Sequence, residues 1–131
     1  MVAQRTLTPY VLVRFQQGLL NKGGIIMNNQ PSIYEIYVLE SPITINRLGM
    51  PQWGKRESVG FYYDLETAKQ VVKDNWADIS DRGKYNAAVI VKKSCGLYPI
   101  TLIQSYYIFN QKTEKYDNEN VPKEMENYNL G

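Results

Sequence analysis

The chain has 131 residues, of which 44% are hydrophobic and 21% charged. This size and composition indicate one globular domain with a single core. The absence of histidine excludes Ser-His and Cys-His nucleophile schemes and removes the commonest metal ligand. The single cysteine, Cys95, excludes an intramolecular disulfide and a thiolate zinc site. We expect Cys95 to be a small, partly buried apolar residue, and we expect neither a metal ion nor a cofactor.

The formal charge of +2 is unevenly distributed along the chain. Residues 1–26 contain three basic residues and no acid, so they carry +3, and the remaining 12 basic and 13 acidic residues give −1. A protein that grips duplex nucleic acid needs a surplus of Lys and Arg. We therefore expect no duplex nucleic acid partner. No apolar run approaches the roughly 18 residues of a spanning helix, so we expect no membrane partner either.

Residues 1–26 look foreign to the domain that follows them. The stretch KGGIIM at 22–27 can be encoded by a purine-rich ribosome-binding sequence, a short AT-rich spacer and a start codon. We therefore expect the domain to begin at Met27, with residues 1–26 as a non-native upstream extension or a disordered, amphipathic arm. This arrangement favours a bacterial or phage gene, and the lone Cys95 fits a reducing, cytoplasmic location in a bacterial host. A signal peptide is not expected, because a long apolar region and a small-residue cleavage site are lacking.

The first expected elements are two strands joined by a long connection. Residues 33–39 are rich in β-branched and aromatic side chains, which predicts a strand. The connection at 41–57 contains two Pro and two Gly, and connections of this length are often functional. Residues 58–63 are predicted to form a second, short strand.

A helix is predicted to begin at Leu65. Asp64 is a suitable N-cap, and Glu66 would lie in the first turn, where the helix dipole favours an acid. Apolar residues recur at helical spacing, so the helix should end at 81–83, where Gly83 suits the left-handed C-terminal position. The expected apolar stripe consists of Leu65, Ala68, Val72, Trp76 and Ile79.

Two more strands are expected at 85–91 and 100–110, separated by a turn at 94–96. Lys115-Tyr116 would extend an edge strand, and the chain from about residue 121 would be a loose tail or a short helix.

The predicted order β-β-α-β-β indicates an α+β fold. One helix would pack on a face of a small, mainly antiparallel sheet. We expect a single domain over 27–120 and a loose C-terminal tail over 121–131. The second face of the sheet would be open or would pair with a second copy. The 11 tyrosines exceed what one core should hide, and Tyr is enriched at interfaces, so we expect a homo-oligomer.

The sequence contains no catalytic motif. The glycines of the main body lack the spacing of a phosphate-binding loop. Asp78 and Asp81 lie at the expected helix end, where a solvated or capping role is ordinary. A carboxylate pair without histidine can also act in glycoside chemistry, so an enzyme that uses carboxylates and Tyr is the least favoured alternative.

Seven residues form the predicted ligand-binding set. Cations and an aromatic ring on the 41–57 connection suit a phosphate or carboxylate ligand. Aromatic rings on the second strand offer stacking surfaces for a base. A solvated loop and ordinary sheet packing are the alternative readings. The set is Arg47, Trp53, Lys55, Arg56, Phe61, Tyr62 and Asn75.

Asn75 falls inside the predicted apolar stripe, where a buried amide must be hydrogen-bonded. Two partners remain open for it: the backbone of the 41–57 connection, or a base or ribose edge of a ligand. Neighbouring residues of a strand point to opposite faces. We therefore expect each aromatic pair, such as Tyr106-Tyr107, to place one ring in the core and one outside.

Five short stretches resemble small proteins of gut bacteria and their phages, with a likeness that covers roughly residues 33–122. The stretches lie at 37–39, 59–68, 75–79, 88–90 and 96–99. The size and the strand–helix–strand order also resemble the Thoeris anti-defence type 1 proteins. Those are phage sponges that sequester cyclic ADP-ribose isomers, and in some cases cyclic oligonucleotides, without cleaving them, and they assemble as oligomers. The resemblance carries over no site residue.

These observations lead to one leading hypothesis and one alternative. The resemblance implies a phage or mobile-element protein that binds and sequesters a nucleotide-derived immune signal without catalysis. The alternative is a protein–protein inhibitor that lays its sheet or acidic tail on a host defence enzyme.

Overall fold

The computed structural model describes residues 31–126. The expected extension at 1–26, the expected start at Met27 and the last part of the expected tail, 127–131, lie outside these residues. From Ser32 onward the described residues belong to one compact unit. No helix within 31–126 is long and apolar enough to cross a membrane.

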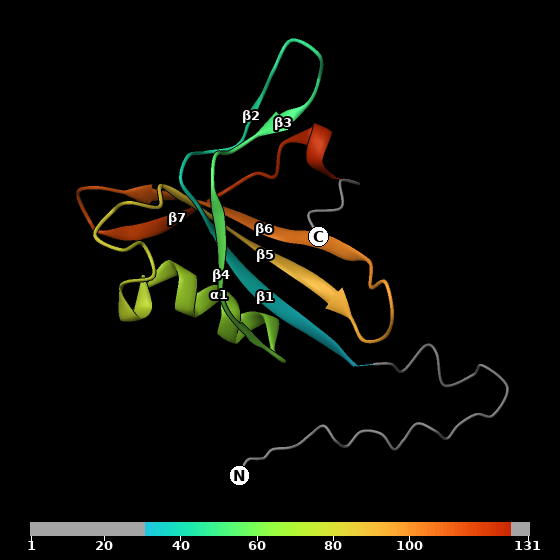
Figure 1. The fold of residues 1–131 in the computed structure, drawn as a ribbon. Coiled ribbons are helices and arrows are strands. Elements are labelled where there is room, and N and C mark those ends of the chain that lie inside the picture. Colours follow the sequence, from blue (N-terminus) through green and yellow to red (C-terminus); the bar gives the residue numbers. More distant parts are fainter. Residues whose placement is uncertain (1–30, 127–131) are drawn as a thin grey trace, which may run out of the picture. The chain divides into compact units, whose positions relative to one another are not determined.

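Five strands form one antiparallel sheet in the order β4-β1-β5-β6-β7 (Figure 1). A single helix, α1 (Leu65–Lys73), packs against one face of this sheet. The predicted α+β architecture is therefore confirmed, including the edge strand at residues 115–116. The strands are β1 Ser32–Leu39, β4 Arg56–Tyr62, β5 Ala87–Ser94, β6 Thr101–Asn110 and β7 Lys115–Glu119.

The long connection after β1 contains a small hairpin that the sequence did not predict. Its strands β2 (Thr44–Ile45) and β3 (Pro51–Gln52) pair antiparallel and project from the sheet in Figure 1. Asn46 holds the turn, because its side-chain oxygen accepts hydrogen bonds from the Leu48 and Met50 N–H groups at 2.8 and 3.0 Å. Strands of two residues are too short to show the alternation on which strand prediction depends.

The start of α1 agrees with the sequence. The Asp64 carboxylate accepts hydrogen bonds from the Thr67 N–H at 2.9 Å and from the Thr67 hydroxyl at 2.7 Å. These bonds lower the pKa of Asp64, with the Thr67 hydroxyl as the largest cause. Asp64 is therefore the N-cap, as predicted.

The predicted end of the helix is wrong. The helix stops at Lys73 and not at 81–83. Asn75 adopts the left-handed conformation, with φ 49° and ψ 46°, and a left-handed residue ends an α-helix. Trp76 lies in a short 3₁₀ helix, Trp76–Asp78, and its ring is exposed, so it does not belong to the apolar stripe.

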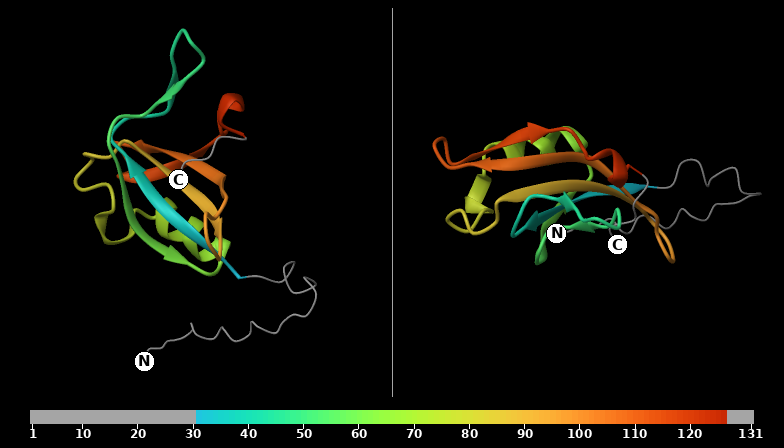
Figure 2. Two further views of the ribbon diagram at one scale, coloured as in Figure 1. Left: turned by 45° about the vertical axis from the view of Figure 1, so that its right-hand side comes forward. Right: turned by 90° about the horizontal axis from the view of Figure 1, so that it is seen from above.

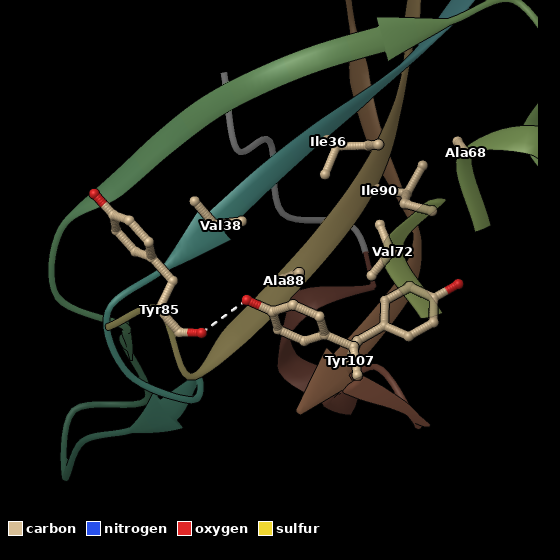
Figure 3. Close-up of a cluster of buried hydrophobic side chains, with 9 residues drawn as sticks. Ile36, Val38, Ala68, Val72, Tyr85, Ala88, Ile90 and Tyr107 are labelled. Atoms are coloured by element: carbon tan, nitrogen blue, oxygen red, sulfur yellow. Dashed lines mark hydrogen bonds between the residues drawn. The ribbon is translucent and has the colours of Figure 1, made fainter. Parts of the chain in front are cut away.

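The main core lies between α1 and the sheet (Figure 3). Tyrosine rings from β6 and β7 pack beside aliphatic residues of β1, β5 and α1. The Tyr116 hydroxyl donates a hydrogen bond to the Tyr85 carbonyl oxygen at 2.7 Å, drawn as the dashed line. The buried residues are Ile36, Val38, Ala68, Val72, Tyr85, Ala88, Ile90, Tyr107 and Tyr116.

A second apolar cluster covers part of the opposite face of the sheet, which was expected to be open or paired. Figure 2, seen from above, shows α1 and the hairpin on opposite sides of the sheet. Trp53 and Ile43 pack on this face from the hairpin side, and Val121 and Met125 pack on it from the C-terminal side. Residues Lys123–Met125 form a 3₁₀ helix.

Because both faces of the sheet are covered, tyrosines on either face are buried. Tyr106 and Tyr107 point to opposite faces, yet both are buried, so the expectation that one of them lies outside is wrong. Of the nine tyrosines in the described part of the chain, only Tyr63 and Tyr98 are exposed. The number of tyrosines therefore gives no argument for an oligomer. Cys95 is exposed, which corrects the expectation that it is partly buried.

Candidate functional site

The predicted cations of the long connection lie in separate places. Arg47 is exposed at the hairpin turn, and Lys55 is exposed just before β4. Trp53 is half-buried and packs on the second-face cluster. Arg56 begins β4, and its guanidinium carbon lies 5.3 Å from the centroid of the Tyr37 ring, which is a cation–π contact.

The aromatic residues of β4 divide between the two faces of the sheet. Tyr62 is half-buried and packs against the core beneath α1. Phe61 is exposed, and its ring meets the Tyr63 ring edge-to-face with the centroids 5.9 Å apart. Phe61 is therefore the ring of β4 that remains accessible to a ligand.

A polar cluster on β1, β4 and β5 surrounds Glu35. Its carboxylate contacts Lys93 Nζ at 2.7 Å and accepts hydrogen bonds from the Ser58 and Tyr37 hydroxyls at 2.6 and 3.1 Å. Burial raises the pKa of Glu35, but these hydrogen bonds and the charge of Lys93 outweigh burial and lower it. The hydrogen bond to Glu35 raises the pKa of Lys93. Glu35 and Lys93 neutralise each other in this ion pair, so neither charge is well placed to hold a ligand.

The Glu35 cluster should make the protein less stable in acid. Because the pKa of Glu35 is lower in the folded chain, its contribution is present above the ordinary value of 4.5 and is lost as pH falls through the folded pKa. Glu35→Gln should therefore flatten the acid limb of a melting-temperature profile. Glu66→Gln is the control, because Glu66 forms only an exposed pair with Lys69. Parallel acid limbs for wild type and Glu35→Gln would contradict this expectation.

An open hollow of about 550 Å³ lies between the segment after α1 and the turn from β6 to β7. Its volume is within the range of roughly 300–1,000 Å³ that is typical of ligand sites. Of the seven predicted ligand-binding residues, Asn75 lines the hollow and the other six do not. The segment after α1 contributes Asn75, Asp78, Ser80 and Arg82. The end of β6 and its turn contribute Phe109, Gln111, Thr113 and Glu114.

Half of the residues that line the hollow have left-handed backbone, which is costly for residues other than glycine. Hydrogen bonds of the Asn75 side chain stabilise this left-handed backbone. The Asn75 side-chain oxygen accepts from the Ser80 N–H at 3.0 Å, and its amide donates to Ser80 Oγ at 3.1 Å and to the Glu114 carbonyl at 3.2 Å. Asn75 therefore does not bond the 41–57 connection. The left-handed residues here are Asn75, Ala77, Asp78, Asp81, Arg82 and Glu114.

Asp78 caps this segment, which was one of the two roles expected for it. Its carboxylate accepts hydrogen bonds from the Arg82 N–H at 3.1 Å and from the Ser80 hydroxyl at 2.9 Å. These bonds, with the one from the Arg82 N–H as the largest cause, lower the pKa of Asp78. The Asp78 carboxylate is thus ionised and largely occupied by the Arg82 N–H and the Ser80 hydroxyl.

Within 31–126, each pKa that departs from its ordinary value is shifted away from neutrality. The pKa values of Glu35, Asp64 and Asp78 are lowered. The hydrogen bond to Glu57 raises the pKa of Tyr85 to about 12, and burial raises those of Tyr106 and Tyr116. Efficient proton transfer at neutral pH needs groups that titrate near pH 7. None of these shifted groups is therefore suited to proton transfer at neutral pH.

The sequence missed most of the hollow because its two walls meet only in the folded chain. Arg82 and Phe109 are 27 positions apart, and the wrongly extended helix hid the left-handed segment. A local signal existed, since residues 74–83 are rich in Asp, Asn, Ser and Gly, which favour turns. Within 31–126 no group of three or more His, Cys, Asp or Glu could hold a metal ion. Comparisons of the chain with family models, curated proteins and solved structures found no match.

Proposed function

We propose that this chain is a non-catalytic phage or mobile-element protein that sequesters a nucleotide-derived immune signal in the cytoplasm of a bacterial host. The ligand class is a cyclic ADP-ribose isomer or a cyclic oligonucleotide. The composition of the hollow beside Asn75 carries the proposal, because one cavity contains a cation, an aromatic ring, amides and carboxylates. The pKa shifts that move away from neutrality support binding without conversion.

Each part of a nucleotide has a matching group in the hollow. The Arg82 guanidinium can pair with a phosphate oxygen. The Phe109 ring offers a partner for a base, and the Gln111 amide can bond the polar edge of that base. Carboxylates commonly accept hydrogen bonds from ribose hydroxyls. Glu114 is an exposed carboxylate of the hollow.

The charges of the hollow restrict the ligand. Two acids, Asp78 and Glu114, line the same hollow as Arg82. At about 4 Å an acid repels a phosphate by roughly 1–4 kcal/mol near a protein surface, similar to the roughly 1.5–3 kcal/mol of a charge-assisted hydrogen bond. A ligand that also offers sugar hydroxyls to the carboxylates is therefore favoured. Inorganic phosphate and pyrophosphate should not bind measurably.

The β4 face is the alternative location for the same ligand. It presents Arg56 and the exposed Phe61 ring, with Trp53 nearby in sequence. Arg56 stacks on Tyr37, and Lys93 is held by Glu35, so fewer free groups converge there. The two locations are distinguished by separate variants.

Arg82→Ala should weaken the ligand by about 10- to 100-fold, which corresponds to the loss of one charge-assisted hydrogen bond. The measurement is titration calorimetry with cyclic ADP-ribose isomers and cyclic oligonucleotides. Lys84→Ala is the matched control, because it removes a cation two residues away that does not line the hollow. This control should bind like the wild type. Mass spectrometry of the released ligand should recover it unchanged.

Three outcomes would contradict the proposal in different ways. If none of these ligands binds, the function is wrong. If Arg56→Ala weakens binding and Arg82→Ala does not, the ligand lies on the β4 face. If the ligand is converted with time, the chain is an enzyme.

One observation favours the alternative of a protein–protein inhibitor. The hairpin turn exposes Leu48 and Met50 beside Arg47, while Asn46 fixes its shape. A preorganised loop with apolar and cationic residues binds a protein at a low ordering cost. Stable co-purification with a host enzyme that Leu48→Asp abolishes would support this function.

A further inference from the structure

The polar side chains that line the hollow fall into two groups, which differ in the hydrogen bonds that they already make within the protein. The members of the first group bond one another, and we call this group the support wall. It consists of Asn75, Asp78 and Ser80. The members of the second group are all exposed, and we call it the binding wall. It consists of Arg82, Gln111, Thr113 and Glu114.

The Ser80 hydroxyl of the support wall has no capacity left for a ligand. A serine hydroxyl offers one donor and two acceptor positions. Ser80 Oγ donates to Asp78 Oδ1 at 2.9 Å. It accepts from Asn75 Nδ2 at 3.1 Å and from the Gly83 N–H at 3.2 Å. Ser80 is also fully buried, so it supports the wall from within the protein.

The Asn75 amide is also fully used as a donor. A carboxamide offers two N–H groups, and three acceptors surround Asn75 Nδ2. Two of them belong to the support wall, Ser80 Oγ at 3.1 Å and Asp78 Oδ1 at 3.4 Å. The third is the Glu114 carbonyl oxygen at 3.2 Å. An amide with both N–H groups engaged in this way has none to donate to a base or a ribose.

The hydrogen bond from Asn75 to Glu114 joins the segment after α1 to the turn between β6 and β7. It spans 39 positions of sequence, and Figures 1 and 2 show the two segments side by side. Glu114 is left-handed, with φ 60°, and its N–H donates to the Asn110 carbonyl oxygen at 2.7 Å. The Glu114 backbone is therefore held by its own turn on one side and by Asn75 on the other.

The side chains of the binding wall still have hydrogen-bonding capacity. Within 31–126 the Arg82 guanidinium, the Gln111 amide and the Glu114 carboxylate have neither a hydrogen-bond nor an ion-pair partner. Thr113 Oγ1 accepts a hydrogen bond from the Lys115 N–H at 3.3 Å, which leaves the hydroxyl proton available. The groups that can meet a ligand are therefore Arg82 and the side chains of the β6–β7 turn.

We propose that the binding wall holds the ligand and that Asn75 is a positioning residue, which fixes the β6–β7 turn relative to Arg82. This inference rests on the sequestration function proposed above, because it divides the roles within the same hollow. It differs from the sequence-based hypothesis in which the Asn75 amide bonds a base or ribose edge. Its physical basis is that binding groups on separate segments must be held within about 0.5 Å of the required geometry by supporting hydrogen bonds.

Amide hydrogen exchange of the full chain, without ligand, tests the positioning role. The Glu114 N–H is the reporter, because its hydrogen bond lies within the turn, and the amides of the central strand β5 report global opening. Asn75→Asp keeps an oxygen for the Ser80 N–H and loses the donor to Glu114. It should raise the exchange rate of the Glu114 N–H by about 5- to 10-fold, as for the loss of one hydrogen bond, with a smaller rise in β5.

Two further variants make this result specific. Asn75→Gly keeps a residue that tolerates the left-handed backbone and removes the amide without adding a charge, so it should give the same rise at Glu114. Gln70→Ala is the matched control. Its amide bonds Asp74 at 2.9 Å, within its own segment, so its removal should leave the exchange of the Glu114 N–H unchanged.

The second arm measures affinity by titration calorimetry with cyclic ADP-ribose isomers and cyclic oligonucleotides. Asn75→Asp and Asn75→Gly should both weaken binding by about 10-fold, because the turn is no longer held against Arg82. Gln111→Ala should also weaken binding, as a direct contact, but should leave the exchange of the Glu114 N–H unchanged. Gln70→Ala should bind like the wild type.

Each other outcome would overturn the inference at a definite point. Unchanged exchange at Glu114 in both Asn75 variants, or an equal rise in β5, would remove the positioning role. Weaker binding with unchanged exchange would make Asn75 a direct ligand contact. A looser turn with unchanged affinity would remove the turn from the binding wall. If no ligand binds the wild type, the proposed function fails, and the exchange arm still decides whether Asn75 holds the turn.

Discussion

Met125→Ala is expected to lower the free energy of unfolding by about 2–5 kcal/mol, the usual cost of truncating a buried Met. Met125 is fully buried and packs on the second face of the sheet in one cluster with Leu39, Val89 and Tyr106. Its N–H donates a hydrogen bond to the Pro122 carbonyl at 2.8 Å, which fixes the turn that aims the side chain at the sheet. Since domains are stable by only about 5–15 kcal/mol, this loss should be evident in urea denaturation.

The neighbouring residue Glu124 is the matched control, because it lies in the same 3₁₀ helix and is exposed. Glu124→Ala should change stability by less than about 0.5 kcal/mol, as is usual for surface positions. If Met125→Ala cost no more than Glu124→Ala, the C-terminal segment would not contribute to the core. The expectation of a loose tail would then apply to residues 121–126 as well.

The parts of the fold that were predictable are those determined by local chemistry. β1 is rich in β-branched and aromatic residues, which predict a strand, and Asp64 followed by Glu66 marks a helix start. The end of the helix was not predictable from apolar spacing. Trp76 and Ile79 continue the 3.6-residue period, but the left-handed Asn75 ends the helix before them.

The second face shows why burial is harder to predict than strand identity. Alternation along β6 correctly places Tyr106 and Tyr107 on opposite faces. What covers the second face comes from two distant segments, one holding Ile43 and the other Met125. The Ile43 N–H donates a hydrogen bond to the Tyr106 hydroxyl at 2.8 Å, across 63 positions of sequence. A contact of that range has no local signal.

In the candidate site, too, the sequence predicts what depends on local chemistry and misses what depends on long-range contacts. The sequence points to Asn75, because an amide among apolar residues needs hydrogen-bond partners, and Asn75 does line the hollow. Its partners, Ser80 and Glu114, were not predictable, because the latter lies on a turn that only the pairing of β6 with β7 brings close. Loop and strand composition points to Arg56 and Phe61, but these residues lie on β4, away from the hollow.

Tyr116→Phe and Tyr107→Phe should change stability in opposite directions, although each removes one buried hydroxyl. The Tyr116 hydroxyl donates to the Tyr85 carbonyl at 2.7 Å in the core. Its removal leaves that carbonyl unsatisfied and should lower the free energy of unfolding by about 1–3 kcal/mol. The Tyr107 hydroxyl is buried and has no hydrogen-bond partner among the described residues. Its removal relieves a desolvation cost, so Tyr107→Phe should raise the free energy of unfolding by up to about 1–3 kcal/mol.

Urea denaturation of both variants beside the wild type measures the two effects under the same conditions. The rings remain in place in both, so the comparison isolates the hydroxyl groups and leaves core volume nearly unchanged. The double variant should have a stability near the wild type if the two effects add, and a departure would measure the coupling between the neighbouring rings. If Tyr107→Phe destabilised the chain as Tyr116→Phe does, the Tyr107 hydroxyl would have a partner in solution, such as a buried water molecule. The core beneath α1 would then contain a polar site, and the burial of Tyr107 would no longer be a cost to the fold.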